Sequence, residues 1–272
     1  MDKRFSIIVV TLNAGEKLIK TVESILGQDY DNYEIIVKDG QSSDDSVKRL
    51  ESLNCEKINI KSQKDTGIYD AMNQGIEFAT GEYVYFLNCG DFFNSDTVLS
   101  KIDSVVNEYE EGKRPGIIYG NIIQRTTGQQ VMSNPKIDAF ACYRNVPCHQ
   151  TSFFRRELVS EHNFRTEYKI RADYEQFLWC FFEKKTPMRY VDYTIVDYEG
   201  DGFSETKKNL KLSKKEHKDI TGQYMSKGQL FKYRLIMAVT LAPLRSAISN
   251  NQKTAKLYNS LKKLIYKGKN SQ

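Results

Sequence analysis

The sequence predicts an α/β fold in which a mainly parallel β-sheet carries helices on both faces. Apolar runs typical of buried strands alternate with segments whose apolar residues recur at helical spacing, the pattern of strand–helix–strand units. Two of the runs lead into an aspartate, Asp39 directly and Asp91 through a three-residue turn. The carboxyl ends of parallel strands are where open α/β sheets bind ligands, so both acids are candidate site residues.

The first third of the chain predicts strands and helices in strict alternation. Segments rich in apolar and β-branched residues predict strands at 5–11, 33–38, 58–61 and 83–87. Apolar residues three or four positions apart predict helices at 18–26, 44–53 and 67–79. Ser42 or Ser43 is expected to cap the second helix, because a serine hydroxyl accepts a hydrogen bond from N–H groups of the first turn.

Beyond Asp91 the pattern is less regular, and a mixed sheet is expected. The elements predicted there are a helix at 98–106, a strand at 117–119, a hairpin at 120–132, an aromatic helix at 174–183 and a last strand at 189–198. From 210 onward the chain is lysine-rich and mostly helical, and Pro243 is expected to kink or end one of its helices. We therefore expect an α/β domain at 1–206 and a basic helical extension at 207–272.

Composition restricts the class of protein. With 40% hydrophobic and 12% aromatic residues, the 272-residue chain can bury a large core. The five cysteines are odd in number and include no Cys-x-x-Cys pair, which disfavours a disulfide framework and a zinc cage. This cysteine usage favours a reducing compartment, so a cytoplasmic location is expected. Neither a signal-peptide pattern nor an apolar stretch long enough to cross a bilayer is apparent.

Charge is distributed unevenly along the chain. Residues 207–272 hold sixteen Lys+Arg against two acids, a net charge of +14, whereas the remainder carries −9 from 24 Lys+Arg and 33 acids. An apolar stripe near the end of the chain lies among lysines: Leu257, Leu261, Leu264 and Ile265. This basic amphipathic pattern predicts peripheral docking on anionic lipid at the inner face of the plasma membrane. Packing of the stripe on the domain or on a second copy, as a homodimer, is the alternative.

Two common nucleotide sites are missing from the sequence. No Gly-x-Gly-x-x-Gly follows the first strand and no Walker-type Gly-Lys-Ser/Thr occurs, which disfavours dinucleotide oxidoreductases and P-loop NTPases. A Mg²⁺ or Mn²⁺ ion held by Asp91 could neutralise a diphosphate instead, because these hard cations prefer carboxylate and phosphate oxygens. The alternative is that Asp91 caps a helix beginning near Asn94.

Asp39 has two interpretations as well. An ionised carboxylate only accepts hydrogen bonds, so Asp39 could accept one from the imide N–H of uracil or thymine. Alternatively, it opens an Asx-turn in the loop at 40–42.

Four motifs follow one another in the first third of the chain. They are Ser-Ile-Ile-Val-Val-Thr-Leu-Asn at 6–13, Ile-Ile-Val-Lys-Asp-Gly-Gln-Ser-Ser-Asp at 35–44, Gly-Ile-Tyr-Asp-Ala-Met-Asn-Gln-Gly-Ile at 67–76 and Gly-Glu-Tyr-Val-Tyr-Phe-Leu-Asn-Cys-Gly-Asp at 81–91. In this order they resemble glycosyltransferase family 2. The resemblance continues more thinly through 149–154 and 172–175 and fades after 204.

That resemblance implies a GT-A fold, a nucleoside-diphosphate sugar donor, a divalent metal ion and inversion at the anomeric carbon. It assigns the metal to Asp91 and the catalytic base to Asp173. The donor-binding residues that it implies are Thr11, Asn13, Asp39, Asp65 and Asn88. Asn88 and Gly90 stand where many family members carry further aspartates, so the ion is expected to depend on Asp91 and the diphosphate, with weaker or water-mediated help from Asn88.

Inversion requires the acceptor hydroxyl to attack opposite the leaving diphosphate, so the base must lie across the sugar from the metal. Asp173 is far enough along the chain for folding to bring it there. The alternative is that Asp173 is only the N-cap of the helix predicted at 174–183.

Further contacts are expected from the second half of the chain. His149 could contact the metal, the diphosphate or the acceptor, or could be held by backbone groups in a loop. Residues 200–204 are expected to form a lid over the donor, beyond which Lys214 or His217 could reach phosphate. The alternative is a solvated, charged loop.

Three functions therefore compete. The first is transfer of a sugar, with UDP-sugars expected as donors, to a glycan or lipid-linked acceptor in cell-surface polysaccharide biosynthesis. The second is a sugar-nucleotide nucleotidyltransferase, which ordinarily needs a glycine-rich basic loop after the first strand. The third is a non-enzymatic binder of membrane or nucleic acid through the basic tail; the acidic first domain argues against nucleic acid.

Overall fold

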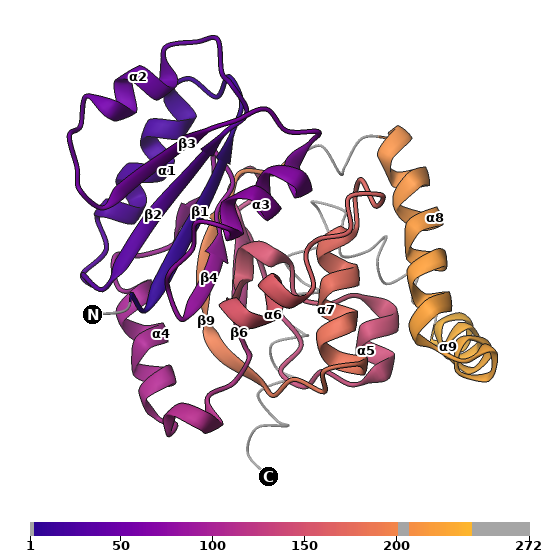
Figure 1. Cartoon of the computed structure of the whole chain (residues 1–272). Helices are drawn as coiled ribbons and strands as arrows, with labels where there is room; N and C mark the ends of the chain where they lie inside the picture. The colour runs from indigo at the N-terminus through magenta and orange to yellow at the C-terminus, as the bar shows by residue number, and fades with distance from the viewer. Residues whose placement is uncertain (1–2, 201–206, 241–272) are drawn as a thin grey trace.

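The computed structural model describes residues 3–200 and 207–240, whose strands form one sheet (Figure 1). The strands are β1 (Phe5–Thr11), β2 (Tyr33–Asp39), β3 (Ile58–Ser62), β4 (Tyr83–Phe86), β5 (Phe92–Phe93), β6 (Ile117–Gln124), β7 (Gln129–Val131), β8 (Ser152–Arg155) and β9 (Met188–Tyr198). Their order is β3-β2-β1-β4-β8-β6-β9-β5, with β7 paired to β6. The strands β1 to β4 are parallel, and β8 runs antiparallel between β4 and β6. The predicted mixed α/β sheet is confirmed.

Helices alternate with the strands as far as β4 and less regularly beyond it. They are α1 (Glu16–Leu26), α2 (Ser46–Glu51), α3 (Ile68–Ile76), α4 (Val98–Asn107), α5 (Ala139–Arg144), α6 (Arg156–Glu161), α7 (Ala172–Phe182), α8 (Lys207–Tyr224) and α9 (Lys227–Val239), with short 3₁₀ turns at Glu111–Lys113 and His149–Thr151. The predicted cap of α2 is wrong, because Ser42 bonds to Asp39 and Ser43 to Asn13, and the helix begins only after Asp45.

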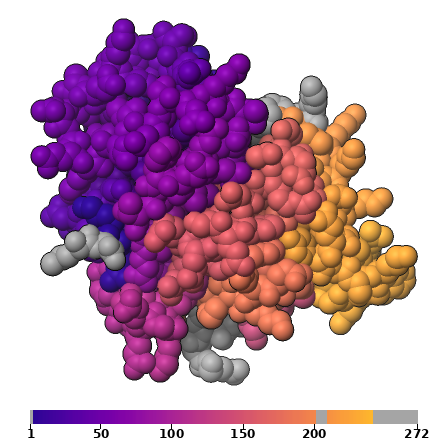
Figure 2. Space-filling view, in the orientation of Figure 1, coloured from indigo at the N-terminus to yellow at the C-terminus, as the bar shows by residue number. Residues whose placement is uncertain are grey.

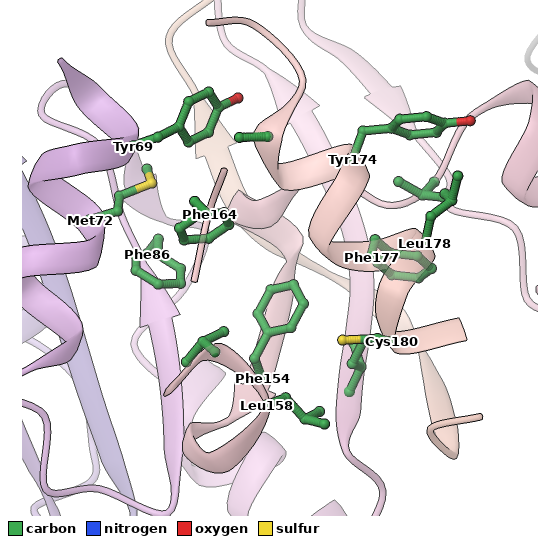
Figure 3. Packing of buried hydrophobic residues seen from close by; sticks show 14 of the residues in the cluster. Tyr69, Met72, Phe86, Phe154, Leu158, Phe164, Tyr174, Phe177, Leu178 and Cys180 are labelled. Carbon is green, nitrogen blue, oxygen red and sulfur yellow. The ribbon is translucent and has the colours of Figure 1, made fainter. Parts of the chain in front are cut away.

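Each face of the sheet carries its own hydrophobic core. Successive side chains of a strand point to opposite faces, so β1 supplies Ile8 to one core and Ile7 to the other. On the Ile8 side, Met72 of α3 and Phe177 of α7 pack over the strands, as Figure 3 shows for the residues around them. On the other side, α1 and α4 cover the sheet. Covering both faces leaves the strand ends as the place for a site.

The described part of the extension packs against the α/β domain rather than standing apart from it. Ile220 of α8, Met225 directly after it and Tyr233 of α9 are buried in the core that contains Ile8. Helix α8 contacts α7, and α9 contacts α5 (Figure 1). The division at 206 and 207 remains a prediction, since the two parts share one core.

Some predictions fall outside the described residues. These are most of the lid at 200–204, the helix stop at Pro243 and the apolar stripe from Leu257 to Ile265. Within the described ranges, no helix has both the length and the apolar character needed to cross a membrane.

Candidate functional site

Parallel pairing brings the ends of β1, β2 and β4 to one edge of the sheet. Thr11 lies opposite Asp39 in the register of β1 and β2, and its carbonyl accepts a hydrogen bond from Gly40 N at 2.9 Å. Beyond the end of β4, the Leu87 N–H still donates to the Ile8 carbonyl of β1. The loops after the three strands therefore leave the sheet side by side.

The loop after β1 is joined to the loop after β2 through Asn13. Its backbone N donates to Ser42 Oγ at 2.8 Å, and its Oδ1 accepts from Ser43 N at 2.7 Å. Asn13 has φ of 51°, a left-handed conformation that asparagine tolerates better than most residues. The two loops consequently form one hydrogen-bonded rim beside Thr11 and Asp39.

Asp39 is 1% exposed and sits inside this rim. Its Oδ1 accepts from Ser42 N at 3.0 Å and Ser42 Oγ at 2.6 Å, and its Oδ2 accepts from Ser62 Oγ at 2.6 Å. The Asx-turn is thus present, with Gln41 N also donating to Oδ2. Recognition of a base by Asp39 remains a prediction.

Asp65 lies next to the same rim and is held by a buried lysine that we did not single out from the sequence. Lys38 is 0% exposed; its Nζ donates to Asp65 Oδ2 at 3.1 Å and to the Asp39 carbonyl at 3.0 Å. A lysine directly after the apolar residues 35–37 of a predicted strand was the available signal, because an ammonium is buried only where it is paired and hydrogen-bonded.

Asp91 is buried, 3% exposed, between β4 and β5. Its Oδ1 accepts from Glu199 N at 2.9 Å, whereas its Oδ2 has no hydrogen-bond partner. Burial raises the pKa of Asp91 to about 6, and the Glu199 N–H and His149 act in the opposite direction. The suggestion that Asp91 caps a helix is wrong: the next residues form β5, and α4 starts only at Val98.

A second unpartnered oxygen lies on the same turn. Asn88 Oδ1 is buried without a hydrogen-bond partner, and the Asn88 carbonyl accepts from Asp91 N at 3.0 Å. Buried polar atoms are seldom left unpaired, and carboxylate and amide oxygens suit Mg²⁺ or Mn²⁺. The residues present therefore fit a divalent ion. Among the described residues no cluster of three or more His, Cys, Asp or Glu could hold such an ion alone.

Asp173 lies in the first turn of α7 and meets His149. Its Oδ2 accepts from His149 Nδ1 at 2.9 Å, and its Oδ1 accepts from Tyr69 Oη at 3.0 Å and from Tyr174 N at 2.9 Å. Burial alone would raise the pKa of Asp173, but these hydrogen bonds and His149 hold it below its ordinary value. The N-cap interpretation is wrong, because Arg171 occupies that position.

His149 connects the Asp173 end of the site with the Asp91 end. The Asp173 carboxylate accepts from Nδ1–H, and in the tautomer protonated at Nδ1 alone the other ring nitrogen, Nε2, accepts from Asn88 Nδ2, 3.3 Å away. With Nδ2 in this contact, Asn88 Oδ1 is left without a hydrogen-bond partner in the protein. Asp173, His149 and Asn88 thus form a continuous chain that reaches the turn carrying Asp91.

Two supports of Asp173 were not foreseen. Tyr69 of α3 is buried and its hydroxyl lies 2.8 Å from the Ile170 carbonyl as well as 3.0 Å from Asp173. Glu216 of α8 is 5% exposed and accepts hydrogen bonds from the backbone N of three successive residues, 169–171, that lead into α7. The extension therefore contributes directly to the position of Asp173.

The two phosphate-contact candidates in α8 lie elsewhere in the described structure. His217 Nε2 donates to the Tyr143 carbonyl at 2.7 Å, and its ring stacks on Tyr174; burial lowers the pKa of His217. Lys214 is exposed. Neither is hydrogen-bonded to Asp91, and a phosphate contact by either remains a prediction.

Comparison with known proteins identifies relatives of this chain. The family model described as Glycosyl transferase family 2 matches residues 6–164. A PGL/p-HBAD biosynthesis glycosyltransferase of Mycobacterium tuberculosis is 31% identical over 209 residues, covering 74% of this chain and 79% of that protein. The amylovoran biosynthesis glycosyltransferase AmsB of Erwinia amylovora is 30% identical over 206 residues, covering 70% of this chain and 67% of that protein.

Solved structures share the fold. Staphylococcus aureus TarS 1–349 matches with a TM-score of 0.60 and 19% identity, covering 72% of this chain and 60% of that one. Its complex with UDP-GlcNAc matches with a TM-score of 0.62 over 83% of this chain and 69% of that one. The mannosyltransferase PcManGT of Pyrobaculum calidifontis, in complex with GDP-Man and Mn²⁺, matches with a TM-score of 0.55 and 14% identity. The match covers 95% of this chain and 84% of that one. At these identities the likeness extends to the fold.

Proposed function

The chain belongs to glycosyltransferase family 2, and on that premise we propose that it moves a sugar from a UDP-sugar to a hydroxyl of a glycan or lipid-linked acceptor, inverting the anomeric carbon. The observation that carries the proposal is the chain of hydrogen bonds from Asp173 through His149 to Asn88 beside the unpartnered Asp91 Oδ2. We propose a cell-surface glycan as the product, and the relatives named for PGL/p-HBAD biosynthesis and for amylovoran biosynthesis are its support.

The donor would bind at the rim formed by the loops after β1 and β2. Thr11, Asn13, Asp39 and Asp65 are the residues that we propose to contact it. The imide N–H of uracil would donate to the Asp39 carboxylate. It would replace the donor of one of the longer hydrogen bonds that Asp39 now accepts, such as Gln41 N at 3.2 Å. Lys38 keeps Asp65 in place from below the rim. Complexes of the structurally similar TarS with UDP and with UDP-GlcNAc support a UDP-sugar.

Asp91 Oδ2 and Asn88 Oδ1 would hold a divalent ion, Mn²⁺ or Mg²⁺, with the remaining ligands from the diphosphate and water. When bound, such an ion offsets the negative charge that grows on the leaving diphosphate. The protein's own part is to orient the two oxygens: Glu199 N fixes the Asp91 carboxylate, and His149 fixes the Asn88 amide.

Asp173 would take the proton of the acceptor hydroxyl as it attacks. Its lowered pKa keeps the carboxylate ionised near neutral pH, so it is ready to accept. Tyr69 has one hydroxyl proton and two acceptors, the Asp173 carboxylate and the Ile170 carbonyl. Once Asp173 is protonated, Tyr69 can donate to Ile170 and accept from Asp173, which gives the transferred proton a partner.

The competing nucleotidyltransferase function gains no support. The match to the family model covers the strand-end motifs, whereas a nucleotidyltransferase would need a glycine-rich phosphate loop that is absent. The cytoplasmic location and the possibility of a homodimer stay proposals, as do the inverting course and the need for metal.

Transfer from a panel of UDP-, GDP- and dTDP-sugars in the presence of Mn²⁺ tests the function. We expect turnover with a UDP-sugar, loss of metal-dependent turnover in Asp91→Ala, and a loss of about 10²–10⁴-fold in Asp173→Asn with UDP-sugar binding retained. Activity of both variants equal to that of the natural chain would refute the assignment. Release of pyrophosphate from a nucleoside triphosphate would instead favour the nucleotidyltransferase.

A further inference from the structure

Helix α9 presents large apolar side chains on the side that faces away from the domain. Phe231, Leu235 and Val239 follow one another at intervals of four residues and are 71%, 55% and 74% exposed. We call these three residues the α9 stripe. On the opposite side Tyr233 is buried against aromatic rings of α5. The helix is thus apolar on two sides, and the domain covers only one of them.

Basic residues lie along both borders of the α9 stripe. At 100° per residue, Lys232 falls on one side of the stripe, and Lys227 and Arg234 fall on the other. All three are exposed, and α9 contains no acidic residue. In Figures 1 and 2 this helix lies at the outer side of the molecule, beyond α8, coloured orange to yellow.

The charge pattern decides between the partners that could cover the stripe. In a two-fold contact between copies, the cations of one α9 would face those of the other with no acid between them, which is unfavourable. Three side chains also bury far less accessible surface than the roughly 800 Å² that each partner buries in a stable interface. An anionic bilayer matches both features, because it accepts apolar side chains at the acyl boundary and attracts cations to its headgroups.

We propose that α9 docks the protein on the surface of an anionic bilayer. Phe231, Leu235 and Val239 enter the boundary between headgroups and acyl chains, while Lys227, Lys232 and Arg234 contact the lipid phosphates. The long stems of lysine and arginine allow their charges to reach the headgroups beside a buried apolar stripe. The docking surface is formed by described residues.

Docking through α9 would place the site near the membrane. The covered face of α9 packs on α5, which ends at Arg144, five positions before His149. A lipid-linked acceptor would then meet the site from the bilayer to which α9 is bound. This adds to the proposed sugar transfer without depending on it, since binding to vesicles can be measured with no sugar present.

Co-sedimentation of the full chain with phosphatidylcholine vesicles, with and without phosphatidylglycerol, tests the proposal. We expect binding that requires phosphatidylglycerol and weakens by at least about ten-fold in Phe231→Ser/Leu235→Ser/Val239→Ser. Lys232→Glu/Arg234→Glu should weaken it by about 25-fold or more, since each cation near an anionic surface contributes about five-fold. Equal binding to both kinds of vesicle would overturn the proposal.

Matched variants separate α9 from general effects of charge and hydrophobicity. Lys20→Glu/Lys48→Glu makes the same change in net charge at exposed positions of α1 and α2, and Leu53→Ser/Val131→Ser removes exposed apolar side chains elsewhere. Both controls should bind as the natural chain does. Equal loss in the controls, or full binding by the α9 variants, would overturn the proposal. A concentration-dependent dimer that the stripe variant abolishes, without lipid binding by the natural chain, would identify a subunit interface instead. Transfer to a water-soluble acceptor, measured on the same variants, reports separately on the proposed function.

Discussion

Replacing Glu216 by glutamine tests whether the extension positions the candidate base. The carboxylate accepts from Lys169 N at 2.9 Å and from Ile170 N and Arg171 N at 3.0 Å each. Glutamine has one accepting oxygen, so it can keep the last two bonds but turns an NH₂ group toward Lys169 N. One unsatisfied N–H costs about 1–3 kcal/mol, and loss of charge weakens each remaining bond by about 1 kcal/mol. We expect Glu216→Gln to lower the free energy of unfolding by about 3–5 kcal/mol.

Denaturant unfolding measures this loss, and sugar transfer measures its effect on the site. Because residues 169–171 lead into the turn that carries Asp173, we expect transfer to fall by about 10²-fold in solutions where the variant stays folded, with UDP-sugar binding unchanged. Asp219→Asn is the control: Asp219 is exposed, lies on the same helix and accepts from Tyr168 Oη, so its loss should cost about 1 kcal/mol or less. A Glu216→Gln protein as stable and as active as the control would refute the reasoning.

Three further predictions follow from individual contacts. Tyr69→Phe removes the hydroxyl that bonds to Asp173 and should lower the rate of transfer at saturating substrate with little change in donor KM; a change in KM alone would contradict a role beside the base. In metal-free protein the pKa of Asp91 is raised from 3.8 to about 6, so its folded state favours the protonated form and loses stability as pH rises through about 6. Unfolding free energies at pH 5 and pH 8 should show this loss in the natural chain but not in Asp91→Asn. Gly75→Ala in α3 would place Cβ 2.6 Å from a β1 isoleucine side chain and should destabilise the protein, whereas Gly222→Ala in α8 has open space and should stabilise it by about 1 kcal/mol; thermal unfolding of both variants decides.

The order of elements could be predicted because it is written in local patterns. The apolar run of β1 and the helical spacing of α1 act within a few residues, and both were found close to the predicted bounds. The start of α2 was not, because the side chain of Asn13, about thirty residues earlier, competes with the helix for Ser43: its Oδ1 accepts from both the backbone N and the hydroxyl of Ser43 and holds the serine in the loop. A local capping rule does not include such a competitor.

The sequence by itself determined the fold class and the family, and it indicated the strand ends after β2 and β4 as the place of the site, with Asp39 and Asp91 at those ends. It also singled out Asp173 and His149, but as separate candidates. These conclusions rest on periodicity and on motif order, which need no knowledge of contacts.

Only the tertiary structure decided how these residues are joined. Asp173 meets Tyr69 across 104 positions of chain, and Glu216 reaches the turn before α7 across 45 to 47 positions. Contacts of that range depend on how whole helices pack on the sheet, and a hydrogen bond between side chains forms only when packing sets both distance and angle. For the same reason the exposed face of α9 became visible only once its other face was seen to be covered by the domain.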